Sequence, residues 1–254
     1  RRHTRYWRDW SSDVCSSDLD TDRLNRNFGF RPGEIDVMVL SHAHIDHSGL
    51  IPKLVKEGFT GKIYCTRATR ELSAILMEDS AQIQEDDIRY VNKRRKLRQE
   101  PFLKPLYTVE DAQAAAHSLV DVDYEQWIPI LDDVELKFTD AGHIIGSACV
   151  HLRIKENGKE KMLTFSGDLG RYRDAILRSP AEFPQADYII MESTYGNSLH
   201  DLHRSTPDMF LEWIEKVCLK NKGKLIIPAF SVGRTQEILY NLNQLELEDR
   251  KSTR

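Results

Sequence analysis

Three histidines and one aspartate stand within six positions of this chain, as His42, His44, Asp46 and His47. Imidazole nitrogens and carboxylate oxygens together form the ligand set of zinc, with manganese or iron as second choices. A loop that leaves a strand and enters a helix can fold back so that four side chains converge. In such a loop His42 and His44 can reach one metal ion while Asp46 and His47 reach another. The alternative, a solvated polar turn, would suit a lone histidine better than this spacing.

The H-x-H-x-D-H spacing resembles the hallmark of the metallo-β-lactamase superfamily. That resemblance implies a further histidine and a bridging aspartate downstream, and the chain offers both. His143 lies in D-A-G-H-I-I-G-S and Asp168 ends F-S-G-D, each after a predicted strand. Small neighbours there let the backbone approach a metal closely. By resemblance, the ligands of one zinc are His42, His44 and His143, those of the other are Asp46 and His47, and Asp168 bridges both.

Four further features resemble the β-CASP branch of that superfamily, which processes RNA. The segment between the first histidine cluster and His143 is long and carries a helical pattern. The sequence DAGHIIGSA at 140–148 matches a pattern of the branch, and ESTYG at 192–196 resembles its acidic motif. PAFSVGRTQE at 228–237 resembles a segment near the start of the inserted β-CASP domain. The resemblance covers about residues 20 to 247 and implies a zinc-dependent hydrolase that cleaves RNA, similar to prokaryotic factors that process mRNA 3′ ends.

The resemblance also implies roles for individual residues. Asp46 is placed to orient the attacking nucleophile as well as to bind metal, and Glu192 is the acid of the motif at 192–196. The segment around Ser231, Gly233 and Arg234 also indicates, apart from the resemblance, a strand followed by a turn and a helix. Free N–H groups at a helix start, together with an arginine, suit a phosphate. The alternative is an ordinary turn with Arg234 on the surface.

The chain departs from the family pattern at both ends. The family begins with two strands and a glycine-rich turn, and it continues past the equivalent of residue 254 with two motifs that each supply a histidine. One completes the second zinc site, and the other pairs with Glu192 and protonates the leaving group. We therefore leave the activity of this chain open. We expect residues 1–19 and 250–254 to be non-native, 20–195 to form the metallo-β-lactamase domain and 196–249 to begin the β-CASP domain.

The elements that must position these residues alternate between strands and helices, which indicates an α/β fold. The expected architecture is an incomplete metallo-β-lactamase αββα sandwich with the start of an inserted β-CASP domain. Thr108, with Asp111 three positions later, is typical of a helix start. Strands are predicted at 35–40, 62–65, 134–139, 148–154, 161–165, 188–191 and 225–227, and the strand at 188–191 is expected to be buried. Helices are predicted at 49–57, 69–98, 108–119, 208–219 and 235–242.

Two other features can be read in more than one way. Residues 93–98 (KRRKLR) hold five basic side chains in six positions. They could grip an RNA backbone, or they could form a solvated helix end that complements the helix dipole. His151 lies in a predicted strand, where a packing histidine with satisfied nitrogens is a simpler reading than a ligand.

Composition sets wider bounds on the function. The 254 residues carry a formal net charge of −4, which argues weakly against nucleic acid but still permits a local basic groove. The four cysteines are far apart, so a reducing cytoplasm is expected. No apolar run approaches the roughly 18 residues of a membrane span. The expected partner is RNA, which only the β-CASP resemblance implies; no membrane is expected, and a homodimer is allowed. The alternatives are a small-ester hydrolase of the glyoxalase or lactonase kind and a non-catalytic RNA-processing scaffold.

Overall fold

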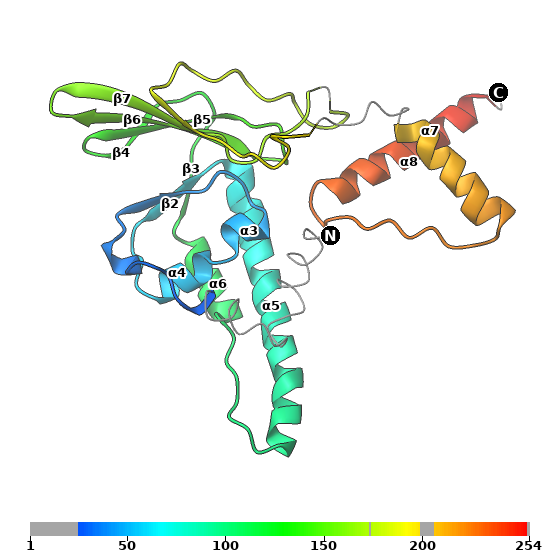
Figure 1. Cartoon of the computed structure of the whole chain (residues 1–254), viewed down its shortest axis with the longest axis horizontal. Helices are drawn as coiled ribbons and strands as arrows, with labels where there is room; N and C mark the ends of the chain where they lie inside the picture. The colour runs from blue at the N-terminus through cyan, green and yellow to red at the C-terminus, as the bar shows by residue number, and fades with distance from the viewer. Residues whose placement is uncertain (1–24, 173, 199–205, 253–254) are drawn as a thin grey trace.

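Two β-sheets lie at the centre of the computed structural model, which describes residues 25–172, 174–198 and 206–252 (Figure 1). The first sheet is parallel, in the order β1–β2–β3. The second has the order β4–β5–β6–β7–β8; its first four strands are antiparallel and β8 runs parallel to β7. The strands of the first sheet are Val37–Val39, Lys62–Cys65 and Leu119–Asp121, and those of the second are Ile128–Leu131, Val134–Asp140, Ala148–Glu156, Lys159–Phe165 and Tyr188–Ile190.

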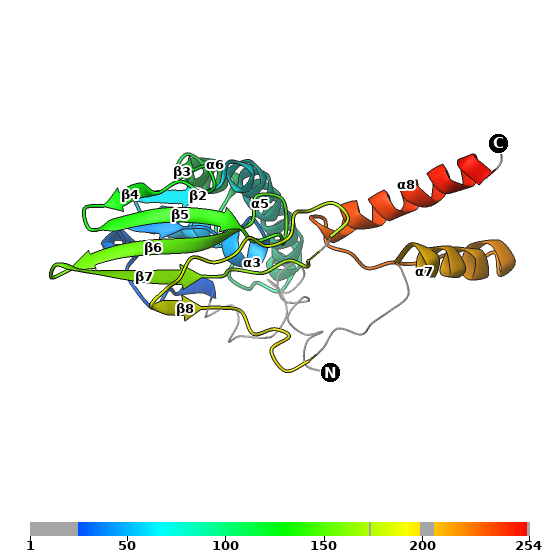
Figure 2. The ribbon, with the colours of Figure 1, turned by 90° about the horizontal axis from the view of Figure 1, so that it is seen from above.

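Helices cover the face of the first sheet that points away from the second sheet (Figure 1). The layers therefore run helices, sheet, sheet. The irregular chain between β7 and β8 passes along the second sheet (Figures 1 and 2). The elements of the helical side are the 3-10 turn η1 (Pro32–Glu34), α3 (Ile45–Ser48), α4 (Ile51–Lys56), α5 (Arg67–Leu97) and α6 (Val109–Ala116).

Strand β2 shows why the layers stack in this way. Successive side chains of a strand point to opposite faces. Ile63 and Cys65 are fully buried in the cluster shared with the helices. Tyr64, between them, packs in the second cluster with Leu136 and Phe138 of the other sheet. One short strand thus joins two apolar cores, and the loops at its end are held between them.

Capping residues fix where two of the helices begin. Thr66 precedes α5, and its side chain accepts a hydrogen bond from the backbone N–H of Thr69. Thr108 and Asp111 form a reciprocal capping box at the start of α6, so the predicted helix start is confirmed. Such caps satisfy backbone donors that the first helical turn leaves unpaired.

The remaining helices lie to one side of the two sheets (Figures 1 and 2). They are α7 (Thr206–Trp213), the π-helix η2 (Ile214–Lys220) and α8 (Arg234–Ser252). The predicted helices at 208–219 and 235–242 fall within them. The domain boundaries stay predictions. Residues 250–252 continue α8, whereas the expectation for 1–19, 253 and 254 concerns positions outside the described residues.

The mixed α/β architecture is confirmed, but several element predictions were wrong. The helix predicted at 108–119 ends at Ala116, because the chain turns and Leu119 starts β3 beside β2. The helix predicted at 49–57 does form, as α4, whereas the short helix α3 that precedes it was not predicted. Strand β4, which carries a proline, was not predicted at all.

Two predicted strands differ in another respect. No strand forms at 225–227, where the described chain offers no pairing partner. The strand at 188–191 does form as β8, but it is not buried: Tyr188, Ile189 and Ile190 are each more than half exposed. β8 is the last strand of its sheet, so only one side of it is paired. Across the described residues, no helix is long and apolar enough to cross a bilayer.

Candidate metal centre

Three loops from different parts of the chain meet at one edge of the sheets. The first follows β1 and carries His42, His44 and the short helix α3. The second joins β5 to β6 and carries His143, and the third follows β7 and carries Asp168. The backbone N–H of Ala148, at the start of β6, donates to the carbonyl of Ser41 at 2.8 Å. This backbone hydrogen bond ties the first loop to the end of the second.

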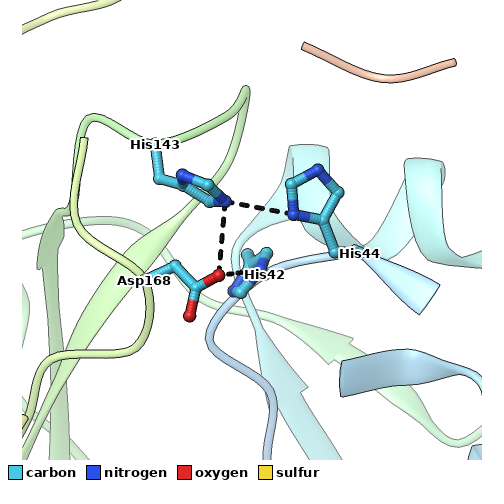
Figure 3. Close-up of side chains that lie close together, drawn as sticks. All are labelled: His42, His44, His143 and Asp168. Atoms are coloured by element: carbon cyan, nitrogen blue, oxygen red, sulfur yellow. Dashed lines mark hydrogen bonds and ion pairs between the residues drawn. The ribbon is translucent and has the colours of Figure 1, made fainter. Parts of the chain in front are cut away.

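Four of the predicted ligands converge closely (Figure 3). One ligand atom from each of His42, His44, His143 and Asp168 lies within 4.8 Å of all the others. His143 Nε2 is 3.0 Å from His44 Nδ1. Asp168 Oδ2 is 3.5 Å from His143 Nε2 and 3.7 Å from His42 Nε2. Ligands bonded to one tetrahedral zinc ion at about 2.0–2.2 Å stand roughly 3.3–3.6 Å apart, so the spacing suits a shared cation.

Of the other two predicted ligands, His47 faces the same carboxylate from another side, and Asp46 lies beside His47. His47 Nε2 lies 3.5 Å from Asp168 Oδ1 and 3.7 Å from Asp46 Oδ2. The His47 ring is tilted against that of His42, with the two centroids 4.1 Å apart. Asp168 therefore presents one oxygen to the three-histidine group and the other oxygen to His47.

The electrostatics of the three-histidine group and Asp168 favour the protonation states that bind a cation. Burial lowers the pKa of His42 to about 3 and also lowers the pKa of His44 and His143. The hydrogen bond from His47 lowers the pKa of Asp168 to about 2, and the same contact raises the pKa of His47. At neutral pH three neutral imidazoles thus surround an ionised carboxylate, which is the state that a metal requires.

Two serines that the sequence reasoning did not single out orient the ligands. Ser41 Oγ lies 3.1 Å from His42 Nδ1, which leaves His42 Nε2 to face the centre. His42 Nε2 is buried and has no hydrogen-bond partner among the described residues. A buried nitrogen without a partner is costly, and a bound cation would satisfy it. Ser147 Oγ accepts hydrogen bonds from the backbone N–H groups of His143 and Ile144, in the loop that carries the third histidine.

The loop that carries His143 is anchored to the start of α5. The carbonyl of Gly146 accepts hydrogen bonds from the hydroxyls of Thr66 and Thr69, at 2.6 and 2.8 Å. Gly146 has φ +83°, and a Cβ at that position would stand 2.6 Å from the Thr69 nitrogen. Only glycine fits this contact without displacement. The G-S pair of the motif signalled a close approach, but the threonine partners could not be identified from it.

Glu192 lies beside the centre. Its Oε1 accepts a hydrogen bond from the backbone N–H of Leu169 at 2.7 Å, next to Asp168. Its own N–H donates to Ser166 Oγ at 3.1 Å. Its charge also acts to raise the pKa of His143, against the larger effect of burial. The structure therefore brings Glu192 together with the predicted ligands.

The segment 228–234 approaches the same edge. The ring of Phe230 lies 6.4 Å from that of His44, and the Val232 carbonyl offsets part of the lowering of the His44 pKa. Gly233 has φ +86° and abuts Ile144. Arg234, at the start of α8, forms an ion pair with Glu237. Of the three predicted phosphate contacts, Ser231 and Gly233 therefore lie in the segment beside the centre, whereas the Arg234 side chain is engaged elsewhere.

Comparison with known proteins places this geometry in a family. A model described as the metallo-beta-lactamase superfamily matches residues 14–227. Ribonuclease TTHA0252 of Thermus thermophilus is 40% identical over 220 residues. Transcription termination factor FttA is 34% identical over 218 residues in Methanosarcina mazei and 35% identical over 216 residues in Thermococcus kodakarensis. A solved subclass B3 metallo-beta-lactamase from a soil metagenome aligns with 54% of this chain and 43% of its own, at 20% identity and a TM-score of 0.32.

The matched relatives are much longer than this chain. The match covers 87% of the chain and 46% of the ribonuclease. It covers 85% of the chain and 32% of the Methanosarcina factor, and 84% of the chain and 31% of the Thermococcus factor. The chain thus spans about half the length of the first relative and a third of the others.

Proposed function

The chain belongs to the metallo-beta-lactamase superfamily, and from that premise we propose that it carries the metal centre of a β-CASP ribonuclease. The proposed reaction is hydrolysis of an RNA phosphodiester bond with two bound zinc ions. One observation carries the proposal: Asp168 directs its two oxygens toward two different groups of ligands. This is the arrangement that a carboxylate between two cations needs.

The donor set fits this proposal. His42, His44 and His143 would hold one ion, Asp46 and His47 the other, and Asp168 both. The buried Nε2 of His42, without a partner among the described residues, supports the first site. The second site has fewer protein donors and is more exposed, since half of the Asp46 side chain is open to solvent. When bound, zinc supplies acidified water at neutral pH and polarises a phosphoryl oxygen.

The chain's own residues would then position the reactants. Asp46 is exposed at the rim, within reach of an attacking water, and we assign it the orientation of that nucleophile. Glu192 is held rigidly by Leu169 and Ser166. We propose that Glu192 orients a general acid. That acid would be the histidine that the β-CASP resemblance implies in a later motif. The N–H groups of Ser231 and Gly233 would contact a phosphate. Arg234 would contact it only after breaking its ion pair with Glu237.

RNA is proposed as the substrate because the Thermus relative is named a ribonuclease. That name, together with the long segments between the ligand loops, disfavours a small-ester hydrolase. A non-catalytic scaffold is disfavoured by the convergence of the ligand set. A cytoplasmic location accords with an RNA substrate, and homodimer formation stays a prediction.

The proposal is tested by single-turnover cleavage of a labelled RNA with excess zinc-loaded protein. Asp46→Ala and His44→Ala should each lower the rate about 100-fold or more, since each removes a group worth several kcal/mol to the transition state. His117→Ala is the matched control, because His117 is exposed and bonds only the Gln113 carbonyl among the described residues. Undiminished cleavage by both site variants would overturn the proposal.

A further inference from the structure

The C-terminal end of α5 and the chain that follows it form the most basic segment of an acidic protein. Six basic residues and one acidic residue lie between positions 93 and 104, in a chain of net charge −4. We call residues 90–104 the basic tip. The side chains of Lys93, Lys96, Arg98 and Lys104 are exposed, and none of the four forms an ion pair with a described carboxylate.

Two arginines of the basic tip have structural contacts instead. Arg95 pairs with Glu100 and donates to the Pro101 carbonyl at 2.6 Å. Arg94 stacks on the ring of Tyr90, with its guanidinium carbon 4.7 Å from the centroid. Glu100, the one acidic residue between positions 93 and 104, is therefore paired with Arg95. The remaining basic side chains can bind a negatively charged partner.

The return segment is held firmly against the helix. The Asn92 side chain exchanges two hydrogen bonds of 2.9 Å with the backbone of Leu103. Phe102, the residue before Leu103, is 62% exposed. Tyr90 is 57% exposed on the preceding turns. A solvated helix end needs no pinned, exposed aromatic rings, whereas a surface for single-stranded nucleic acid combines cations with such stacking platforms.

The basic tip is far from the metal centre. Helix α5 begins where Thr69 bonds to Gly146, in the loop of His143. At about 1.5 Å per residue, Lys93 lies about 36 Å further along the helix, which extends beyond the layers of the fold (Figure 1). Residues of the tip cannot touch a phosphate at the centre. A stacked strand of about ten nucleotides, at about 3.4 Å each, would span the gap.

We propose that the basic tip is a second contact site for single-stranded RNA, separate from the metal centre. It rests on the proposed function in one respect, that RNA is the ligand. Lys93, Lys96 and Arg98 hold the phosphate backbone, while Tyr90 and Phe102 stack on bases. The site favours RNAs long enough to reach from the tip to the centre.

The test is binding of fluorescein-labelled single-stranded RNAs of 6 and 30 nucleotides, measured by anisotropy across a range of salt concentrations. The triple variant K93A/K96A/R98A should bind the 30-mer about 100-fold more weakly at 0.1 M salt. The slope of log K against log salt should become shallower by about 2, since each lost phosphate contact contributes about 0.7. The variant Y90A/F102A should weaken binding of the 30-mer about tenfold with little change in slope.

The matched control K62A/K155A/K159A removes three exposed cations elsewhere and should bind nearly as wild type. Thermal melting of each variant checks that it is folded. Equal losses in both triple variants would show a general charge effect and overturn the proposal. Full binding by K93A/K96A/R98A would also overturn it and would leave an acidic protein partner for this surface.

The two proposals can fail separately. His44→Ala should lose cleavage but should still bind the 30-mer, because that binding depends on the basic tip. If His44→Ala cleaves normally, the proposed catalytic centre is wrong and the binding result still stands. If the triple variant binds normally, the tip proposal is wrong and the cleavage result still stands.

Discussion

Two buried histidines, His42 and His151, have lowered pKa values for the same reason but have different surroundings. Burial lowers the pKa of His42 to about 3 and that of His151 to about 4. Both ring nitrogens of His151 bond threonine hydroxyls, Thr139 and Thr164, at 2.9 Å. His42 has one nitrogen bonded and the other open toward the carboxylate of Asp168. The reading of His151 as a satisfied packing histidine is confirmed.

His151 should make the fold sensitive to acid. The unfolded chain takes up a proton on this residue below pH 6.5, while the folded chain does so only near pH 4. Stability from this group is therefore complete above pH 6.5 and is lost as the pH falls from 6.5 to 4, by up to about 3 kcal/mol. His151→Gln cannot titrate there, so its unfolding free energy should fall less between pH 7 and 4.5. Urea denaturation at both pH values, in chelator, measures this, and equal falls in both proteins would contradict it.

At the scale of elements, the contact between α5 and the His143 loop should control metal binding from a distance. Gly146→Ala places a Cβ against the backbone of Thr69 and strains a residue with positive φ. Gly158→Ala is the matched control, since Gly158 has φ +71° but open space around it. The control should cost about 1 kcal/mol, and Gly146→Ala about 1–3 kcal/mol more.

Gly146→Ala should also weaken zinc binding, because the displaced loop carries His143, whereas Gly158→Ala should leave it unchanged. Denaturation curves and zinc titrations of both variants provide the check. Equal stabilities and equal zinc affinities for the two variants would show that this contact does not position the loop.

The elements that sequence reasoning found are those with strong local signals. The strand at 62–65 and the capping box at Thr108 are both indicated by residues that are adjacent in the sequence. The misses depended on partners distant in sequence. Leu119 becomes a strand only because β2 lies beside it, and 225–227 does not become one because the described chain offers no partner strand. Burial of β8 could not be predicted because it depends on what covers the sheet.

The same division applies to the site. The ligand types and their spacing were visible in the sequence, since they cluster in short motifs after predicted strands. The supporting contacts were not, because Ser41, Thr66 and Thr69 are ordinary polar residues until the fold brings Ala148 and Gly146 to them. Sequence motifs therefore identify the metal ligands, whereas the residues that support those ligands are known only from the tertiary structure.

At the scale of the whole molecule, a metal bound between three loops should stabilise the fold as a unit. The ligands come from segments as far apart as His42 and Asp168, and the unfolded chain cannot gather them. Zinc at about 100 times its Kd should therefore add about 2.7 kcal/mol to the unfolding free energy. Thermal melting with zinc and with chelator measures this increase in stability. The control variant His117→Ala should show the same increase as the wild type. A zinc gain undiminished in His143→Ala would place the ion elsewhere.

The most direct test of the central claim is to locate the metal in crystals of the zinc-loaded chain by anomalous diffraction at the zinc edge. We expect a peak at about 2.0–2.2 Å from nitrogens of His42, His44 and His143 and an oxygen of Asp168, and a second, weaker peak beside His47 and Asp46. A zinc-loaded crystal with no peak within bonding distance of these three histidines would contradict the claim.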